Sequence, residues 1–167
     1  MVNPELLGDV LGQDLVLRHG VLQHAEIRAA ESAAPTPGAA EFLAACQDTG
    51  RPVAVVSNNC LAAVRAYLER VGLADLVQHI EARDPADPTR MKPSPYLVER
   101  AAQAIGVPLT RCLLIGDQPT DIQAAQAVGA ASIGYANKPG RYVDLAAAGA
   151  DAITIQMDEL AEAVRAS

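Results

Sequence analysis

The sequence predicts an α/β fold with a doubly wound parallel sheet, and two observations carry this prediction. Short apolar runs such as Val53–Val56 and Cys112–Ile115 do not alternate with polar residues, which is typical of strands that are covered on both faces. Between the runs lie longer segments with apolar residues at helical spacing, and several of these stop at a glycine. Strands that alternate with helices in this way build a parallel sheet with helices on both sides.

The composition fits one globular domain. Of the 167 residues, 50% are hydrophobic and 20% are charged, which is enough for a single core. Only 3% are aromatic and tryptophan is absent, so we expect a core of alanine, valine, leucine and isoleucine. The net charge of -7 argues against nucleic acid or an anionic membrane as a partner, because both favour basic surfaces. A small anion stays compatible, since a bound cation reverses the local field.

The cysteines and the N-terminal residues indicate the cellular compartment of the protein. Cys46, Cys60 and Cys112 form no Cys-x-x-Cys pair, so free thiols in a reducing compartment are expected rather than disulfides or a zinc site. The first residues lack the basic start and apolar run of a signal peptide. No apolar stretch reaches the ~20 residues that cross a bilayer. We therefore expect a cytoplasmic protein.

The N-terminal part is predicted to be separate from the rest of the chain. Leu6–Ser32 is mostly helical in character. The segment Ala33–Gly38 that follows contains two prolines and a glycine, which resist both helix and sheet. We predict a boundary here, with a helical segment over residues 1–34 and the α/β domain over residues 35–167.

The elements of the α/β domain are each predicted from an apolar run or a helical repeat with its stop signal. Ser94 is the expected N-cap of the third helix, with Pro95 at its first position. The expected elements are, in chain order, the helix Ala39–Thr49, the strand Val53–Val56, the helix Leu61–Val71, the strand His79–Arg83, the helix Pro95–Ile105, the strand Cys112–Ile115, the helix Ile122–Val128, the strand Ala131–Tyr135, the helix Tyr142–Ala148, the strand Ala152–Ile155 and the helix Asp158–Arg165.

Polar residues follow two of these strands. In doubly wound folds ligands bind beyond the carboxyl ends of the strands, so these residues are candidates for a site. Ser57 and Asn58 come directly after the first strand and precede a helix, where a hydroxyl and backbone N–H groups bind anions. The alternative is that they only cap the helix.

A pair of carboxylates follows the third strand. Asp117 and Asp121 lie four residues apart at a turn from strand to helix. Such a pair suits Mg²⁺, which takes a few carboxylates together with water and phosphate. The alternative is that Asp121 caps the helix and Asp117 helps to form the turn. Mutual repulsion of the two charges favours the metal site, because a cation between them relieves it.

Lys92 lies between these two motifs, next to Pro93 and just before a helix. The proline keeps the local chain extended, so the ammonium can point back to the strand ends. There it would neutralise a phosphate. A single lysine is more often a solvated surface residue, and this alternative stays open.

The order of these motifs resembles the haloacid dehalogenase superfamily. The matching pieces are VAVVSNN (residues 53–59), KPSPYLVERA (residues 92–101) and LLIGDQPTDIQAAQAVGAASIGYANKPG (residues 113–140). The resemblance extends from about Pro35 to the C-terminus. It is greatest to the phosphoglycolate-phosphatase-like branch, in which a helical cap is inserted between the first and second motifs.

The resemblance implies a Mg²⁺-dependent phosphatase of small phosphorylated metabolites. A carboxylate nucleophile of such enzymes forms an aspartyl-phosphate that water then hydrolyses. Ser57 and Asn58 would bind the phosphoryl oxygens, and Lys92 would be catalytic by pairing with the phosphate and the nucleophile. Asp117 would bind Mg²⁺, directly or through water, and Asp121 would support it.

The first motif of the family, an Asp-x-Asp after the first strand, is not found before Ser57 in this sequence. Aligning the family's glycine on Gly20 would put Leu17 and His19 at the acidic positions, and neither can be the nucleophile. We therefore interpret residues 1–34 as a truncated cap remnant and expect this chain to be inactive alone. A non-catalytic phosphate-binding or regulatory domain is the alternative.

The missing first strand has a structural consequence, because this strand is central in the family's sheet. Leu15–Leu17 could fill its place, a neighbouring molecule could, or the sheet could close up. An exposed edge would allow self-association. Two other fold families are disfavoured. A receiver domain has its acidic residues before the hydroxyl residue, and a dinucleotide-binding domain needs a Gly-x-Gly-x-x-Gly motif after a strand, which is absent.

Overall fold

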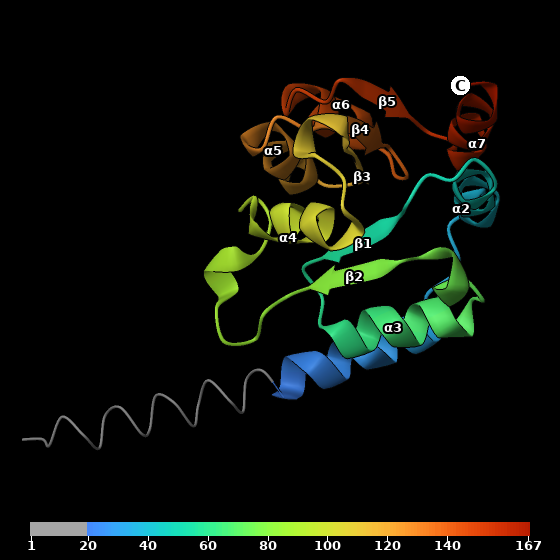
Figure 1. Cartoon of the computed structure of the whole chain (residues 1–167). Coiled ribbons are helices and arrows are strands. Elements are labelled where there is room, and N and C mark those ends of the chain that lie inside the picture. The colour runs from blue at the N-terminus through green and yellow to red at the C-terminus, as the bar shows by residue number, and fades with distance from the viewer. Residues whose placement is uncertain (1–19) are drawn as a thin grey trace, which may run out of the picture.

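The computed structural model describes residues 20–167 and contains five short parallel strands with helices around them (Figure 1). The first part of the predicted helical segment Leu6–Ser32, up to residue 19, and the possible strand Leu15–Leu17 lie outside the described residues. The described elements are a helix over residues 20–32, α2 (Ala39–Asp48), β1 (Ala54–Ser57), α3 (Leu61–Arg70), η1 (Ala74–Leu76), β2 (His79–Ala82), η2 (Pro88–Arg90), α4 (Tyr96–Ile105), η3 (Leu109–Arg111), β3 (Leu113–Gly116), α5 (Pro119–Ala127), β4 (Ala131–Tyr135), α6 (Arg141–Ala147), β5 (Ala152–Thr154) and α7 (Met157–Ala166).

The element order confirms the predicted α/β fold. All ladders are parallel, with β1 paired to β2 and with β4 between β3 and β5. Most predicted ends agree with the observed ones within two residues. The helix α5 begins at Pro119, earlier than the predicted Ile122, because Gln118 and Asp121 form a capping box at its N-terminus.

The N-terminus of α4 corrects one prediction. Pro95 is the N-cap residue and no side chain caps the helix. The hydroxyl of Ser94, the predicted cap, accepts a long hydrogen bond of 3.4 Å from the N–H of Tyr96. The N-cap thus lies one residue later than predicted, although the hydroxyl of Ser94 still contacts the N–H two positions later, at the long end of hydrogen-bond distances.

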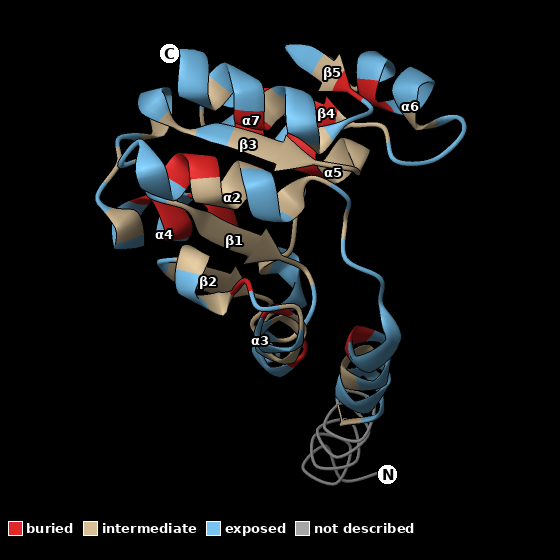
Figure 2. Cartoon of the chain, turned by 90° about the vertical axis from the view of Figure 1, so that its right-hand side faces the viewer, coloured by how far each residue is buried: buried red, intermediate tan, exposed pale blue. Residues whose placement is uncertain are grey.

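The core consists of small and medium aliphatic side chains, as the composition predicts. Leu97 of α4, Ile122 of α5 and Leu145 of α6 are completely buried, and so is Ala45 of α2. In Figure 2 buried positions are seen on helices around the strands, α2, α4 and α7 among them, and in β4. The alanine-rich faces allow close packing: α2 lies against α7, and α4 lies across β1 and β2. No helix of the described chain is long and apolar enough to span a membrane.

The strands form two separate sheets instead of one. The first contains β1 and β2, and the second contains β3, β4 and β5. Figures 1 and 2 show β1 and β3 as the strands by which the two sheets face each other. Within residues 20–167, neither strand has a pairing partner on that side. The sheet has therefore not closed up between β1 and β3, and the exposed-edge interpretation of the sequence remains a prediction.

The helix over residues 20–32 lies beside α3 (Figure 1). Ala30 is buried in this contact. The guanidinium of Arg70 on α3 donates from Nε to the carbonyl of Ala30 at 3.0 Å and from Nη2 to the carbonyl of Ala33. These bonds satisfy carbonyl groups at the end of the helix, which lack partners within it. The described part of the N-terminal segment is thus attached to the first sheet unit.

Candidate functional site

Lys92 connects the carboxyl ends of the two sheets. Its Nζ lies 2.6 Å from Oδ1 of Asp121, at the start of α5, and donates at 2.8 Å to the carbonyl of Val56 in β1. The side chains of Lys92 and Asp121 are 11% and 7% exposed, so solvent screens this ion pair only weakly. The lysine is thus a fixed charge at the strand ends and not a solvated surface residue.

Asn58 holds the backbone of Lys92 through its side-chain amide. The N–H of Lys92 donates to Oδ1 at 2.8 Å, and Nδ2 donates to the carbonyl of Lys92 at 3.0 Å. Both polar atoms of the side chain are therefore engaged, and the two bonds fix the loop that carries the lysine. This arrangement places Asn58 at the predicted site, but its side chain faces the protein.

Asp121 is fixed by a second contact besides Lys92. Its Oδ2 accepts the N–H of Gln118 at 3.0 Å in the capping box of α5. Gly116, the last residue of β3, lets the carboxylate approach: a Cβ there would lie 2.3 Å from Oδ2 and 2.4 Å from the Cβ of Asp121. The contacts of the Asp121 carboxylate with Lys92 and with Gln118 thus depend on the glycine that directly precedes Asp117.

Ser57 and Asp117 have free capacity at the same edge. The Oγ of Ser57 accepts the N–H of Asn59 at 3.1 Å, which leaves the hydroxyl proton for another acceptor. Oδ2 of Asp117 accepts from Nδ2 of Asn137 at 3.2 Å and weakly from Gln118. Asn137 follows β4. Asn137 was not among the predicted site residues, although the rule of polar residues after strands applies equally to Ala131–Tyr135.

The donors present fit one part of a magnesium site. Mg²⁺ is usually held by one or two carboxylates, with water and phosphate oxygens completing its octahedron. Asp117 has an oxygen, Oδ1, without a hydrogen bond among the described residues. Asp121 is already engaged by Lys92 and Gln118. No group of three metal-binding side chains gathers within residues 20–167. Asp117 thus fits as a single ligand, and the predicted metal role of Asp121 remains a prediction.

A buried ion pair under the loop after β1 was not predicted. Arg83, which follows β2, pairs with Glu26 of the helix over residues 20–32, with Nη1–Oε1 and Nη2–Oε2 distances of 2.5 and 3.1 Å. Both side chains are about nine-tenths buried. Burial raises the pKa of Glu26, but hydrogen bonds from Arg83 and from the N–H of Cys60 outweigh it and lower the pKa below its ordinary value. The strand prediction ended at Arg83, but no sequence signal linked it to Glu26.

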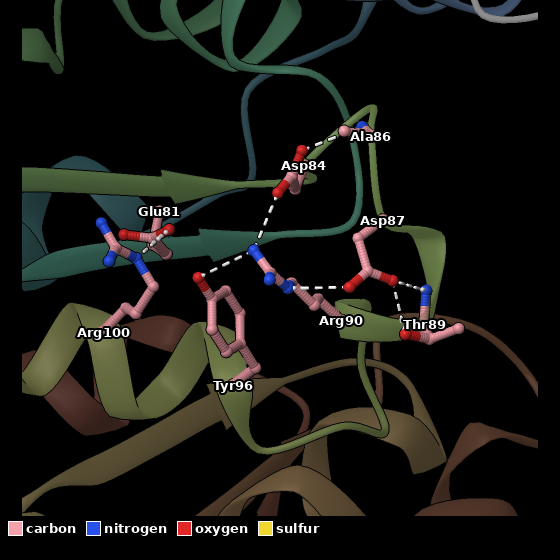
Figure 3. Close-up of polar contacts among 8 residues, drawn as sticks. All are labelled: Glu81, Asp84, Ala86, Asp87, Thr89, Arg90, Tyr96 and Arg100. Carbon is pink, nitrogen blue, oxygen red and sulfur yellow. Dashed lines mark hydrogen bonds and ion pairs between the residues drawn. The ribbon is translucent and has the colours of Figure 1, made fainter.

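A polar network stabilises the segment between β2 and α4 that leads to Lys92 (Figure 3). The guanidinium of Arg90 contacts Asp84 at 3.0 Å, Asp87 at 2.9 Å and the hydroxyl of Tyr96 at 3.1 Å. Hydrogen bonds from Thr89 lower the pKa of Asp87. The side chain of Arg90 is 40% exposed, so each pair contributes little to stability alone. Their joint effect is to restrict the loop.

Comparisons with known proteins agree with this geometry. The family model of haloacid dehalogenase-like hydrolases matches residues 2–129. The chain is 33% identical over 107 residues to a phosphoglycolate phosphatase of Rhodospirillum rubrum, which covers 62% of this chain and 44% of that protein. The chain therefore spans less than half the length of this curated relative.

Solved structures share the fold. A hydrolase of the same family from Deinococcus radiodurans, with bound phosphate and sodium, is 34% identical with a TM-score of 0.66, over 75% of this chain and 56% of that one. CbbY from Rhodobacter sphaeroides in complex with phosphate is 25% identical with a TM-score of 0.69, over 80% of this chain and 60% of that one. Phosphate is the ligand named for both.

Proposed function

The chain belongs to the haloacid dehalogenase-like hydrolases, and from this premise we propose that it forms the phosphate-binding half of a phosphatase site for small phosphorylated metabolites. The observation that carries the proposal is the fixed ammonium of Lys92 between Asp121 and the end of β1. An ammonium held at the strand ends, where little water screens it, offsets the charge of a phosphoryl group that shares it with Asp121. Relatives that bind phosphate support the same ligand here.

Each side chain has a distinct role in this proposal. Ser57 donates its hydroxyl to a phosphoryl oxygen, and Asn58 contributes its backbone N–H while its side chain holds Lys92. Lys92 offsets the charge of the phosphoryl group, where most of the stabilisation in such reactions lies. Asp117 would hold Mg²⁺, which adds positive charge against the phosphoryl oxygens. Asp121 keeps Lys92 in place and would support the metal only indirectly.

The attacking carboxylate is not part of the proposed set. No Asp-x-Asp precedes Ser57 in the sequence, and covalent phosphoryl transfer in this family needs a carboxylate to attack phosphorus. We propose that residues 1–34 form a cap remnant beside the domain over residues 35–167, and that this chain binds phosphate without turning it over. A purely regulatory phosphate-binding domain is the second candidate, favoured by the same missing residue.

Turnover by the pure chain tests the missing nucleophile. We expect p-nitrophenyl phosphate with Mg²⁺ to be hydrolysed no faster than in buffer. Without the Asp-x-Asp carboxylate, no aspartyl-phosphate forms for water to hydrolyse. Asp117→Asn is the control variant, since it removes the proposed metal ligand and nothing that attacks phosphorus. Magnesium-dependent turnover that Asp117→Asn abolishes would contradict the proposal and identify this chain as a complete phosphatase.

A further inference from the structure

We propose that Glu26 and Arg83 are positioning residues of the phosphate-binding loop, here defined as Ser57–Cys60. Neither residue would touch phosphate. They would fix the peptide groups of the loop and, through Asn58, the backbone of Lys92. This inference rests on the proposed function for the identity of the ligand, but its structural part can be tested without one.

The carbonyl groups of the loop are turned toward Arg83. Nη1 of Arg83 donates to the carbonyl of Asn58 at 3.0 Å, and its backbone N–H donates to the carbonyl of Asn59 at 3.1 Å. A peptide group that directs its carbonyl to one side directs an N–H to the other. The N–H groups of these two peptides, those of Asn59 and Cys60, donate to Oγ of Ser57 and to Oε2 of Glu26, so each peptide is fixed at both its carbonyl and its N–H.

Glu26, on the helix over residues 20–32, supports the end of the loop. Its Oε2 accepts the N–H of Cys60 at 2.8 Å, at the N-terminus of α3, and both of its oxygens accept from Arg83. The carboxylate thus holds the end of the loop and orients the guanidinium that holds its middle. A bidentate contact of this kind fixes angle as well as distance.

The charges of the pair explain why both members are needed. The side chains of Arg83 and Glu26 are 7% and 11% exposed, so removing one leaves the other charge buried without a partner, which is costly. Nε of Arg83 is buried without a hydrogen-bond partner among the described residues. The guanidinium therefore depends on Glu26 and the loop for its remaining contacts.

The support extends from the loop to Lys92. Asn58 is held by Arg83 at its carbonyl and holds the N–H and carbonyl of Lys92 with its side chain. A change at Glu26 can therefore reach Lys92 through three consecutive polar contacts. It also follows that the helix over residues 20–32, outside the predicted α/β domain, takes part in building the site.

The test uses the full 167-residue chain and a charge-neutral double variant. Glu26→Gln combined with Arg83→Met removes the buried pair without leaving a lone charge, so the fold is expected to survive. Arg100→Gln is the control, because it removes a half-exposed arginine that pairs with Glu81 at 3.0 Å and does not touch the loop. Amide hydrogen exchange at Asn59, Cys60 and Lys92 is measured first, followed by titration with inorganic phosphate.

We expect exchange of the Lys92 and Cys60 amides to be at least about tenfold faster in the double variant, and phosphate affinity to be at least about tenfold weaker, which corresponds to one lost charge-assisted hydrogen bond. Amides of β4 in the double variant should be unchanged, and so should those of Asn59, Cys60 and Lys92 in Arg100→Gln. A purely structural role would instead speed exchange throughout the sheet.

Two outcomes separate the inference from the function on which it rests. Unchanged exchange at Lys92 and Cys60 in the folded double variant overturns the inference, whatever the chain binds. Selective loss of protection in a chain that binds no phosphate even as the wild type supports the positioning role and rejects the phosphate site. Binding that weakens together with the protection supports both.

Discussion

Lys92 and Asp121 meet at 2.6 Å, and each also has a backbone partner that limits its movement. At the scale of the residue, the site is built from such double contacts. The strand-end rule predicted which residues gather, because polar groups after parallel strands share one edge. It did not predict that Asn58 would bind the backbone of Lys92, since that contact joins residues 34 positions apart. The rule applies to Asn137 after β4, but the pairing of Glu26 with Arg83 could not be predicted because it depends on tertiary packing.

Gly116→Ala tests how closely Asp121 must approach β3. The added methyl would lie 2.3 Å from Oδ2 of Asp121, so the carboxylate has to move away from Lys92 and Gln118. We expect unfolding in denaturant to show a loss of about 1–3 kcal/mol, the usual cost of overpacking. Gly20→Ala is the control, because nothing lies within 4 Å of its added Cβ. A Gly116→Ala protein within about 0.5 kcal/mol of the wild type would show that the contact is unimportant.

At the scale of the element, local signals predicted most helices and strands because apolar runs, prolines and glycines are local properties. The ends that differ do so for reasons that involve side-chain contacts. The helix α5 gains a turn through its capping box, and α4 begins at Tyr96 without the predicted cap. The attachment of the helix over residues 20–32 to α3 and to the loop after β1 could not be predicted from local signals, because it joins residues far apart in the sequence.

The stability of that attachment should depend on pH. The pKa of Glu26 is lowered in the folded chain, so its contribution is present above its ordinary value of 4.5 and is lost as pH falls through the lower folded value. We expect Glu26→Gln to be less stable than the wild type at about pH 7 and the difference to vanish in acid. Denaturant midpoints of both proteins across the acidic range measure this. A constant difference at all pH values would rule out the ionised carboxylate as the cause.

At the scale of the whole molecule, residues 20–167 form two parallel sheets joined at their carboxyl ends by Lys92. The strands could be predicted from local apolar runs, and the absent first motif predicted a disturbed sheet. How the sheet would rearrange stayed open, because strand pairing is a tertiary property that local patterns do not specify. The described residues leave β1 and β3 unpaired toward each other.

Hydrogen exchange distinguishes the strands by their neighbours. The strand β4 is paired on both sides, whereas β1 has one partner within residues 20–167. Backbone N–H groups without a ladder partner exchange faster, so the β1 amides that do not face β2 should exchange well before those of β4. Equal protection would mean that the free edge of β1 is covered by chain outside the described residues or by a second copy.

The central claim, a phosphate site built on Lys92, is tested most directly by titrating the chain with inorganic phosphate while observing its amide resonances. Lys92→Met combined with Asp121→Asn removes the ammonium without leaving a buried charge, and Lys138→Met removes the exposed second lysine of the chain. We predict saturable shifts at Asn58, Asn59 and Lys92, an affinity at least about tenfold weaker in the double variant, and little change in Lys138→Met. Equal affinity of the wild type and the double variant, or no saturable binding by the wild type, would contradict the claim.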